Sequence, residues 1–249
     1  MDDEPLLRMV NISKNFGAVK ALRNVNFELF PNEVLGLVGD NGAGKSTLVK
    51  ILGGAYPPTR GEIFLEGQKV DFTQPADAIN QGIQMIYQDL AVAENIDVAG
   101  NIFLGKEPEK AILGGIMKII DKKRMEELSW QTLEKVKIEI GSVKAKVETL
   151  SGGQRQAVAI ARAISAKAKI IIMDEPAASL GVKEVHELLG VIRELREKGL
   201  AIIFISHRLE DIFAVGDRVI VLKGGRRIGD RIIEETTRDE VRRLIVEGV

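Results

Sequence analysis

The chain has no cysteine among its 249 residues. This absence excludes disulfide bonds and thiolate metal sites, and it suits a reducing compartment. Long apolar runs are missing as well, since no stretch approaches the roughly 18 consecutive apolar residues of a membrane-spanning helix. The acidic start Met1–Glu4 is unlike the basic first region of a signal peptide. We therefore expect any contact with a membrane to go through a partner.

An excess of one charge is also lacking. Lysine and arginine together number 35 and aspartate and glutamate 36, which gives a net charge of −1. The chain therefore lacks the broad positive field of a protein dedicated to nucleic acids, although a local basic patch remains possible. Its length allows at most two domains, and we expect one globular unit over residues 1–249.

What the sequence does contain is a glycine-rich segment that fits the phosphate-binding pattern G-x-x-x-x-G-K-S/T. It reads Gly39-Asp40-Asn41-Gly42-Ala43-Gly44-Lys45-Ser46-Thr47. The apolar run 34–38 predicts a strand before it, and apolar residues at helical spacing predict a helix from Lys45 onward. Glycines in such a loop turn backbone N–H groups toward phosphate oxygens, and the helix N-terminus adds partial positive charge. We expect Lys45 to reach the β- and γ-phosphates and the Ser46 hydroxyl to bind Mg²⁺.

Two acids follow a second apolar run. Residues 170–173 are Ile-Ile-Ile-Met, and Asp174 and Glu175 come directly after them. A buried strand that ends in carboxylates beside a phosphate site is typical of phosphoryl-transfer enzymes. We expect Asp174 to hold Mg²⁺ through water and Glu175 to orient and polarise the water that attacks the γ-phosphate.

A second helix start also offers phosphate-binding donors. Ser151-Gly152-Gly153-Gln154 precedes a segment rich in small residues, 157–166, which predicts a helix. Backbone N–H groups at such a start favour anions. The chain therefore has two candidate phosphate-binding ends, one at Lys45 and one at Ser151.

The pattern of the remaining chain predicts α/β architecture around a largely parallel sheet. Strands are expected near 6–13, 23–30, 61–66, 84–87, 169–174, 200–206, 217–223 and 225–231. Alternation in the first two indicates a half-exposed antiparallel sheet. Between about 90 and 165 strand signals vanish and apolar residues recur at helical spacing, so we expect an inserted helical subdomain there. The core and the antiparallel subdomain then comprise 1–89 and 166–249.

The phosphate-binding loop, the Ser-Gly-Gly segment and the strand that ends in two acids follow one another in this order along the chain. In this order of motifs the chain resembles the nucleotide-binding subunit of an ATP-binding cassette (ABC) transporter, and the resemblance covers nearly its whole length. The resemblance implies the ABC ATPase version of the P-loop NTPase fold, with a mainly parallel core sheet, an antiparallel β subdomain and an inserted helical signature subdomain. It also implies a head-to-tail homodimer that sandwiches two ATP molecules with Mg²⁺. Each ATP would touch Lys45 of one subunit and Ser151 and Gly153 of the other.

Three further positions match the pattern of this family. Phe16 resembles the aromatic residue that stacks on adenine, Gln88 the glutamine that senses Mg²⁺ and water, and His207 the histidine that responds to the γ-phosphate. The chain also departs from the family, because Ala177 stands where Thr or Ser is common and Gly181 where an aspartate often ends the loop. These departures bear on communication between the two ATP sites, whereas Glu175 is present.

Within the family, three segments look most like ATPases of simple-sugar importers that handle pentoses or hexoses. They are 16–22, 75–78 and 101–105. This resemblance implies a peripheral protein at the cytoplasmic face of the cell membrane, bound to transmembrane permease subunits and served by an extracytoplasmic sugar-binding protein. No nucleic-acid partner is expected.

Two other functions remain open at the level of sequence. One is a soluble ABC protein that acts on ribosomes or DNA, which the near-neutral charge and the short insertion disfavour. The other is a switch that dimerises on ATP without hydrolysing it, which the presence of Glu175 and His207 disfavours. Salt-dependent RNA or DNA binding would favour the first, and turnover that does not depend on Glu175 would contradict hydrolysis as proposed.

Overall fold

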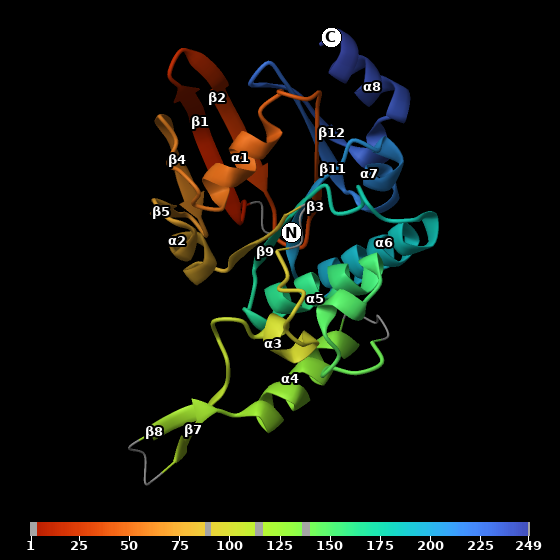
Figure 1. Ribbon diagram of the computed structural model, residues 1–249. Helices are drawn as coiled ribbons and strands as arrows, with labels where there is room; N and C mark the ends of the chain where they lie inside the picture. Colours follow the sequence, from red (N-terminus) through yellow and green to blue (C-terminus); the bar gives the residue numbers. More distant parts are fainter. Residues whose placement is uncertain (1–3, 88–90, 113–116, 136–139, 249) are drawn as a thin grey trace. The chain divides into compact units, whose positions relative to one another are not determined.

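The computed structural model describes residues 4–87, 91–112, 117–135 and 140–248. The chain divides into two compact units, coloured along the sequence in Figure 1. The first contains residues 1–88, 168–178 and 192–249, and the second contains residues 89–167 and 179–191. Each unit is therefore assembled from more than one segment of the chain.

One sheet of the first unit is antiparallel, with the strand order β2-β1-β4-β5. Its strands are β1 (Leu7–Phe16), β2 (Val19–Leu29), β4 (Arg60–Leu65) and β5 (Gln68–Val70). The first two extend beyond their predicted ranges. Register shifts interrupt their pairing, and Asn11 and Asn24 both have a φ of 52°. Such irregularities break the apolar alternation, which is why the sequence pattern revealed only part of each strand.

The other sheet of the first unit has six strands in the order β12-β11-β3-β10-β9-β6, and only β12 is antiparallel to its neighbour. They are β3 (Val34–Val38), β6 (Ile83–Ile86), β9 (Ile170–Asp174), β10 (Ala201–Ile205), β11 (Arg218–Lys223) and β12 (Arg226–Ile232). Every residue of β3 and β10 is buried. Strands covered on both faces appear as continuous apolar runs in a sequence. The predicted α/β fold with a mainly parallel sheet and an antiparallel subdomain is confirmed.

Short helices complete the first unit. They are α1 (Lys45–Leu52), α2 (Pro75–Asn80), α7 (Leu209–Val215), α8 (Arg238–Glu247) and the 3₁₀ turn η3 (Ile233–Glu235). Apolar side chains of both sheets and of α1 form one continuous buried cluster. This core holds the junction between β3 and α1, where the phosphate-binding pattern lies.

The second unit is mainly helical. It contains α3 (Val98–Ile102), α4 (Lys122–Glu134), the 3₁₀ turn η2 (Val147–Thr149) and α5 (Gly152–Ser165). The helix α6 (Val182–Glu197) begins in this unit and ends in the first. Among the described residues, no helix of either unit is both long and apolar enough to cross a membrane.

The expectation that residues 90–165 contain no strand is wrong. A two-stranded antiparallel hairpin joins β7 (Glu109–Ile112) to β8 (Met117–Ile120) ahead of α4 (Figure 1). Its strands are almost entirely exposed, so burial imposes no alternation on them. The Gly114-Gly115 pair between two short apolar runs was the signal in the sequence that favoured a hairpin.

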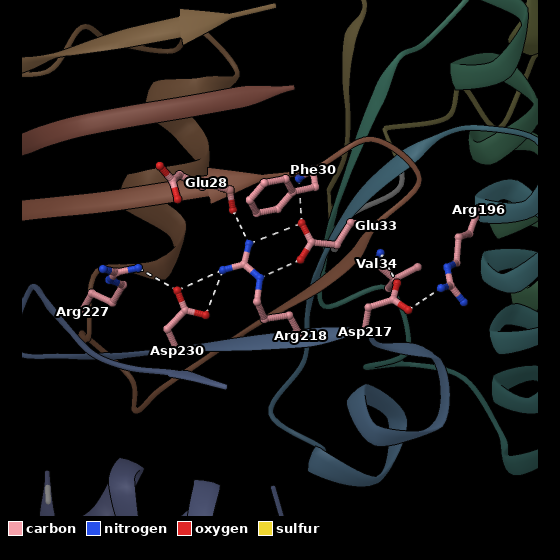
Figure 2. Close-up of polar contacts among 9 residues, drawn as sticks. All are labelled: Glu28, Phe30, Glu33, Val34, Arg196, Asp217, Arg218, Arg227 and Asp230. Atoms are coloured by element: carbon pink, nitrogen blue, oxygen red, sulfur yellow. Dashed lines mark hydrogen bonds and ion pairs between the residues drawn. The ribbon is translucent and has the colours of Figure 1, made fainter. Parts of the chain in front are cut away.

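A partly buried ionic network fixes the entry to β3, as Figure 2 shows. Arg218 Nε donates to Glu33 Oε1 at 2.7 Å, and Arg218 Nη1 donates to Asp230 Oδ1 at 2.8 Å. The same guanidinium donates to the Glu28 carbonyl at 2.7 Å. One side chain therefore joins the end of β2, the start of β3 and the β11–β12 pair.

Candidate active site

The phosphate-binding segment forms the connection between β3 and α1. Gly39, Gly42 and Gly44 have φ values of 146°, 81° and 106°, in the left-handed region that favours glycine. A Cβ on Gly39 would lie 2.2 Å from the Leu222 carbonyl oxygen. The loop therefore needs glycine at this position both for its backbone angle and for its contact with β11.

Lys45, the first residue of α1, lies folded over this loop. Its Nζ donates to the carbonyl oxygens of Gly39 at 2.6 Å and Asp40 at 3.1 Å. Burial lowers the pKa of the Lys45 ammonium, and the nearby charges of Glu175, Asp174 and Asp40 oppose that effect. A buried cation held by carbonyl oxygens can exchange these partners for phosphate oxygens, which form stronger charge-assisted hydrogen bonds.

The two acids after β9 differ in their surroundings. Burial, and then the charge of Glu175, raises the pKa of the Asp174 carboxyl, while Lys50 and Lys45 oppose the rise. Glu175 has a φ of 51°, unusual for a residue with a side chain, and its N–H donates to the Ile205 carbonyl at 3.0 Å. Backbone strain of this kind is frequent at functional sites.

His207 meets Glu175 at the ends of two neighbouring parallel strands. Asp174, the last residue of β9, is in register with Ile205, the last residue of β10, so the segments that follow lie side by side. The His207 Nδ1 lies 3.3 Å from the Glu175 Oε2, with the His207 side chain 62% exposed and that of Glu175 25% exposed. The structure thus brings together Lys45, Asp174, Glu175 and His207 at one edge of the six-stranded sheet, where ligands of α/β proteins bind.

Phe16, at the end of β1, is 46% exposed. Its ring meets Tyr56 edge-on, with centroids 5.2 Å apart and planes at 87°. Lys14 Nζ lies 5.3 Å from the Phe16 ring centroid and 4.7 Å from that of Tyr56. Tyr56 also forms a side-chain hydrogen bond with Thr47, which opposes the raising of its pKa by burial. An exposed aromatic face is thus tied to the phosphate-binding loop.

Sequence reasoning missed Lys14 and Tyr56. Neither belongs to a spaced motif, and Tyr56 follows a Gly-Gly pair in a loop. Its hydroxyl reaches Thr47 only because the chain folds back after α1. No pattern in the sequence pointed to that contact.

In the second unit, Ser151 caps α5. The Ser151 Oγ accepts from the Gln154 N–H at 3.3 Å, and the Ser151 N–H donates to Gln154 Oε1 at 3.1 Å, which is a capping box. The Gly153 N–H donates to Glu184 Oε1 at 3.3 Å. Gly152 is the first residue of α5 and follows the N-cap residue Ser151. The Ser-Gly-Gly segment is therefore the start of a helix, as predicted.

Glu184 was also missed by sequence reasoning. Its second carboxylate oxygen accepts from the Gly181 N–H at 2.9 Å, and these backbone hydrogen bonds, first from Gly181 and then from Gly153, lower its pKa. The spacing from Gly181 to Glu184 is that of half a capping box, a signal that could have identified it.

The residues present suit Mg²⁺. The Ser46 hydroxyl and the Asp174 carboxylate supply oxygen ligands, which Mg²⁺ prefers. Across the described ranges no group of three or more His, Cys, Asp or Glu could hold a metal by itself. Mg²⁺ is usually bound by one or two carboxylates together with substrate phosphates and water rather than by a protein cage. Gln88, the third predicted metal ligand, lies outside the described residues.

Comparison with solved structures supports the fold. A nucleotide-free ATP-binding cassette from an ABC transporter matches with a TM-score of 0.80 at 28% identity, over 98% of this chain and 96% of that one. The ADP conformation of another ATP-binding cassette of an ABC transporter matches with a TM-score of 0.82 at 28% identity, over 97% and 95% of the two chains.

Comparison of sequences identifies the family. The chain is 45% identical to the xylose/arabinose import ATP-binding protein XylG of Sulfolobus acidocaldarius, over 95% of this chain and 92% of the relative. It is 43% identical to the fructose import ATP-binding protein FrcA of Rhizobium meliloti, over 92% and 88%. It is also 43% identical to the ribose import ATP-binding protein RbsA 1 of Rubrobacter xylanophilus, although it spans 47% of that protein's length. The family model described as ABC transporter matches residues 22–178, and the chain belongs to this family.

Proposed function

We propose that this chain is the ATP-hydrolysing motor subunit of an ABC importer for a monosaccharide. The import of xylose/arabinose, fructose and ribose named for three relatives supports the substrate class. These relatives do not favour the alternative of a protein acting on ribosomes or DNA. The observation that carries the catalytic part of the proposal is the convergence of Lys45, Asp174, Glu175 and His207 at one edge of the sheet.

In the proposed site, ATP lies along the loop from Gly39 to Thr47. Its adenine stacks on the exposed face of Phe16, and its phosphates accept from backbone N–H groups of Asp40, Asn41, Gly42 and Gly44, while the Ala43 N–H holds the loop in shape by donating to the Asp40 carbonyl at 3.0 Å. The Lys45 ammonium moves from the loop carbonyls to the β- and γ-phosphates. Ser46 and Asp174, together with Gln88, would hold Mg²⁺, which when bound neutralises phosphate charge.

Hydrolysis uses the carboxylate of Glu175. Glu175 orients a water molecule and draws its proton, the water oxygen forms a bond to the γ-phosphorus, and the bond from that phosphorus to the β-phosphate oxygen breaks. The products are ADP and phosphate. His207, 3.3 Å from the Glu175 carboxylate, fixes that side chain and contacts the γ-phosphate.

The motor acts as a head-to-tail homodimer on a permease. Ser151, Gly152, Gly153 and Gln154 of one subunit meet the γ-phosphate bound by the other, so ATP closes the pair and hydrolysis reopens it. The signature subdomain is assigned to about 90–165, with the core and β subdomain over 1–89 and 166–249. The permease docks near Gln88 and the signature subdomain at the cytoplasmic face of the membrane, and an external sugar-binding protein delivers the solute.

The test compares Mg²⁺-dependent ATP hydrolysis and sedimentation for wild type, Glu175→Gln and the control Glu187→Gln. We expect Glu175→Gln to lose at least a hundredfold in turnover, in line with removal of a general base, and to form an ATP-stabilised dimer. Glu187→Gln should behave as wild type, because Glu187 has no role in the proposed site and pairs on α6 with Lys183. Full turnover in Glu175→Gln contradicts the mechanism. If wild type alone turns over slowly, the same comparison is made after reconstitution with the permease.

A further inference from the structure

A cationic cavity lies in the first unit, among β1, β2, the start of β4 and the turn between β11 and β12. Its volume is about 390 Å³, within the range of small-molecule sites. Four cationic side chains line it: Lys20, Arg23, Arg60 and Arg226. The polar residues Asn15 and Thr59 lie among them. The wall is therefore cationic and rich in hydrogen-bond donors.

Within the part of the chain that the structure describes, no acidic side chain compensates the charges of this cavity. None of the four cationic side chains makes an ion pair or a side-chain hydrogen bond within the described parts of the chain. Neighbouring cations do have acidic partners, since Arg227 pairs with Asp230. The described residues that line the cavity include no acid. Four like charges around one cavity repel one another, and a bound anion relieves that repulsion.

Hydrogen bonds hold the walls in place. The Asn15 N–H donates to Thr59 Oγ1 at 3.0 Å, which ties β1 to the segment that enters β4. The Arg23 N–H donates to the Gly225 carbonyl at 2.7 Å, which ties β2 to the turn that carries Arg226. The cations thus project from segments whose backbones are fixed to one another, as preorganised binding requires.

This cavity is distinct from the proposed ATP site. Its lining contains neither Phe16 nor any residue of the phosphate-binding loop. Along β1, Lys14 and Phe16 face Tyr56, whereas Ser13 and Asn15 line the cavity. Successive side chains of a strand point to opposite faces, so β1 has the adenine platform on one side and the cations on the other.

We propose that this cavity binds a small organic bisphosphate. Two phosphate monoesters together carry about −3 to −4 charges near neutral pH, which matches the four cations. Three of these cations are arginines, whose planar guanidinium groups bind phosphate through paired hydrogen bonds. An RNA strand fits less well, because the lining offers no aromatic residue for bases to stack on. The proposal does not depend on the transport function.

The test is calorimetric titration with fructose 1,6-bisphosphate while a non-hydrolysable ATP analogue and Mg²⁺ saturate the phosphate-binding loop. Fructose 6-phosphate and fructose serve as probes with one phosphate and none. We expect affinity to fall in this order, and to fall about tenfold in each of Arg60→Gln and Arg226→Gln, because each removes a charge-assisted pair. The matched control is Lys110→Gln, which removes one exposed charge from β7 in the second unit.

Each other outcome overturns the proposal. If the wild-type protein gives no binding heat, the four cations form a solvated surface that binds no bisphosphate. If Arg60→Gln, Arg226→Gln and Lys110→Gln all bind the bisphosphate with equal affinity, the bisphosphate binds at a site other than this cavity. Displacement of the bisphosphate by a single-stranded RNA oligonucleotide of higher affinity and steep salt dependence assigns the cavity to nucleic acid. Circular dichroism of each variant confirms that it is folded.

Discussion

At Asp174, the proposed function and the stability of the fold favour different charge states of the carboxyl group. Its pKa is raised in the folded chain, chiefly by burial and then by the charge of Glu175. The folded state therefore takes up a proton at a higher pH than the unfolded state does, and the ionised carboxylate destabilises the fold above that range. The ionised carboxylate is nevertheless the form that would bind Mg²⁺ in the proposed site.

Replacement of Asp174 by asparagine should raise the melting temperature at neutral pH while it abolishes Mg²⁺-dependent hydrolysis. The stabilisation disappears on acidification below the ordinary aspartate pKa of about 3.9, because there the wild-type carboxyl is protonated in both the folded and the unfolded state. In a chain of this size each kcal/mol corresponds to about 2–4 °C. Calorimetry across the pH range measures the difference, with the exposed Asp71→Asn as control. A variant that melts below wild type at neutral pH contradicts the argument.

At the scale of elements, Tyr56 links two parts of the proposed ATP site. It holds the Phe16 ring at the end of β1 by an edge contact and the Thr47 hydroxyl at the start of α1 by a hydrogen bond. The Phe16 ring, which is the proposed adenine platform, and the phosphate-binding loop therefore both contact the same side chain.

Tyr56→Phe should raise the KM for ATP about fivefold with little change in kcat. The variant keeps the ring contact but loses one hydrogen bond, worth about 1 kcal/mol. Steady-state kinetics measure the effect. The matched control is Tyr87→Phe, which removes a hydroxyl from a tyrosine that is 38% exposed. Equal KM values for the two variants would show that the link to Thr47 does not position ATP.

The helices and strands also show which parts of the structure can be predicted from the sequence. β3, β9 and β10 were predicted because burial on both faces leaves continuous apolar runs. The β7–β8 hairpin was missed because exposure imposes no pattern. Motif spacing predicts roles for Lys45 and Glu175, whereas the contacts of Tyr56 and Glu184 exist only after folding.

At the scale of the whole molecule, the Arg218 network connects parts of the first unit that are far apart in the sequence. Glu33 is buried, and Arg218 supplies its ion pair while it also joins β2, β11 and β12 (Figure 2). Removal of one partner from such a pair leaves an uncompensated buried charge, which is strongly destabilising.

Arg218→Met should therefore lower the free energy of unfolding by about 3–5 kcal/mol, as measured by urea denaturation. Arg218→Met combined with Glu33→Leu should recover part of this loss, because no buried charge is then left unpaired. The surface variant Arg227→Met should cost about 1 kcal/mol or less. Equal losses for Arg218→Met and Arg227→Met would show that the network is not a structural anchor.

The contact between Gly39 and the backbone of Leu222 has a consequence for synthesis of the chain. The glycine-rich motif leaves the ribosome early, but β11, which forms one wall of its loop, follows near the end of the sequence. A nascent chain that stops short of β11 has the motif without that wall. Because such non-local contacts form late, nascent chains should acquire tight nucleotide binding only once residues 218–223 have emerged.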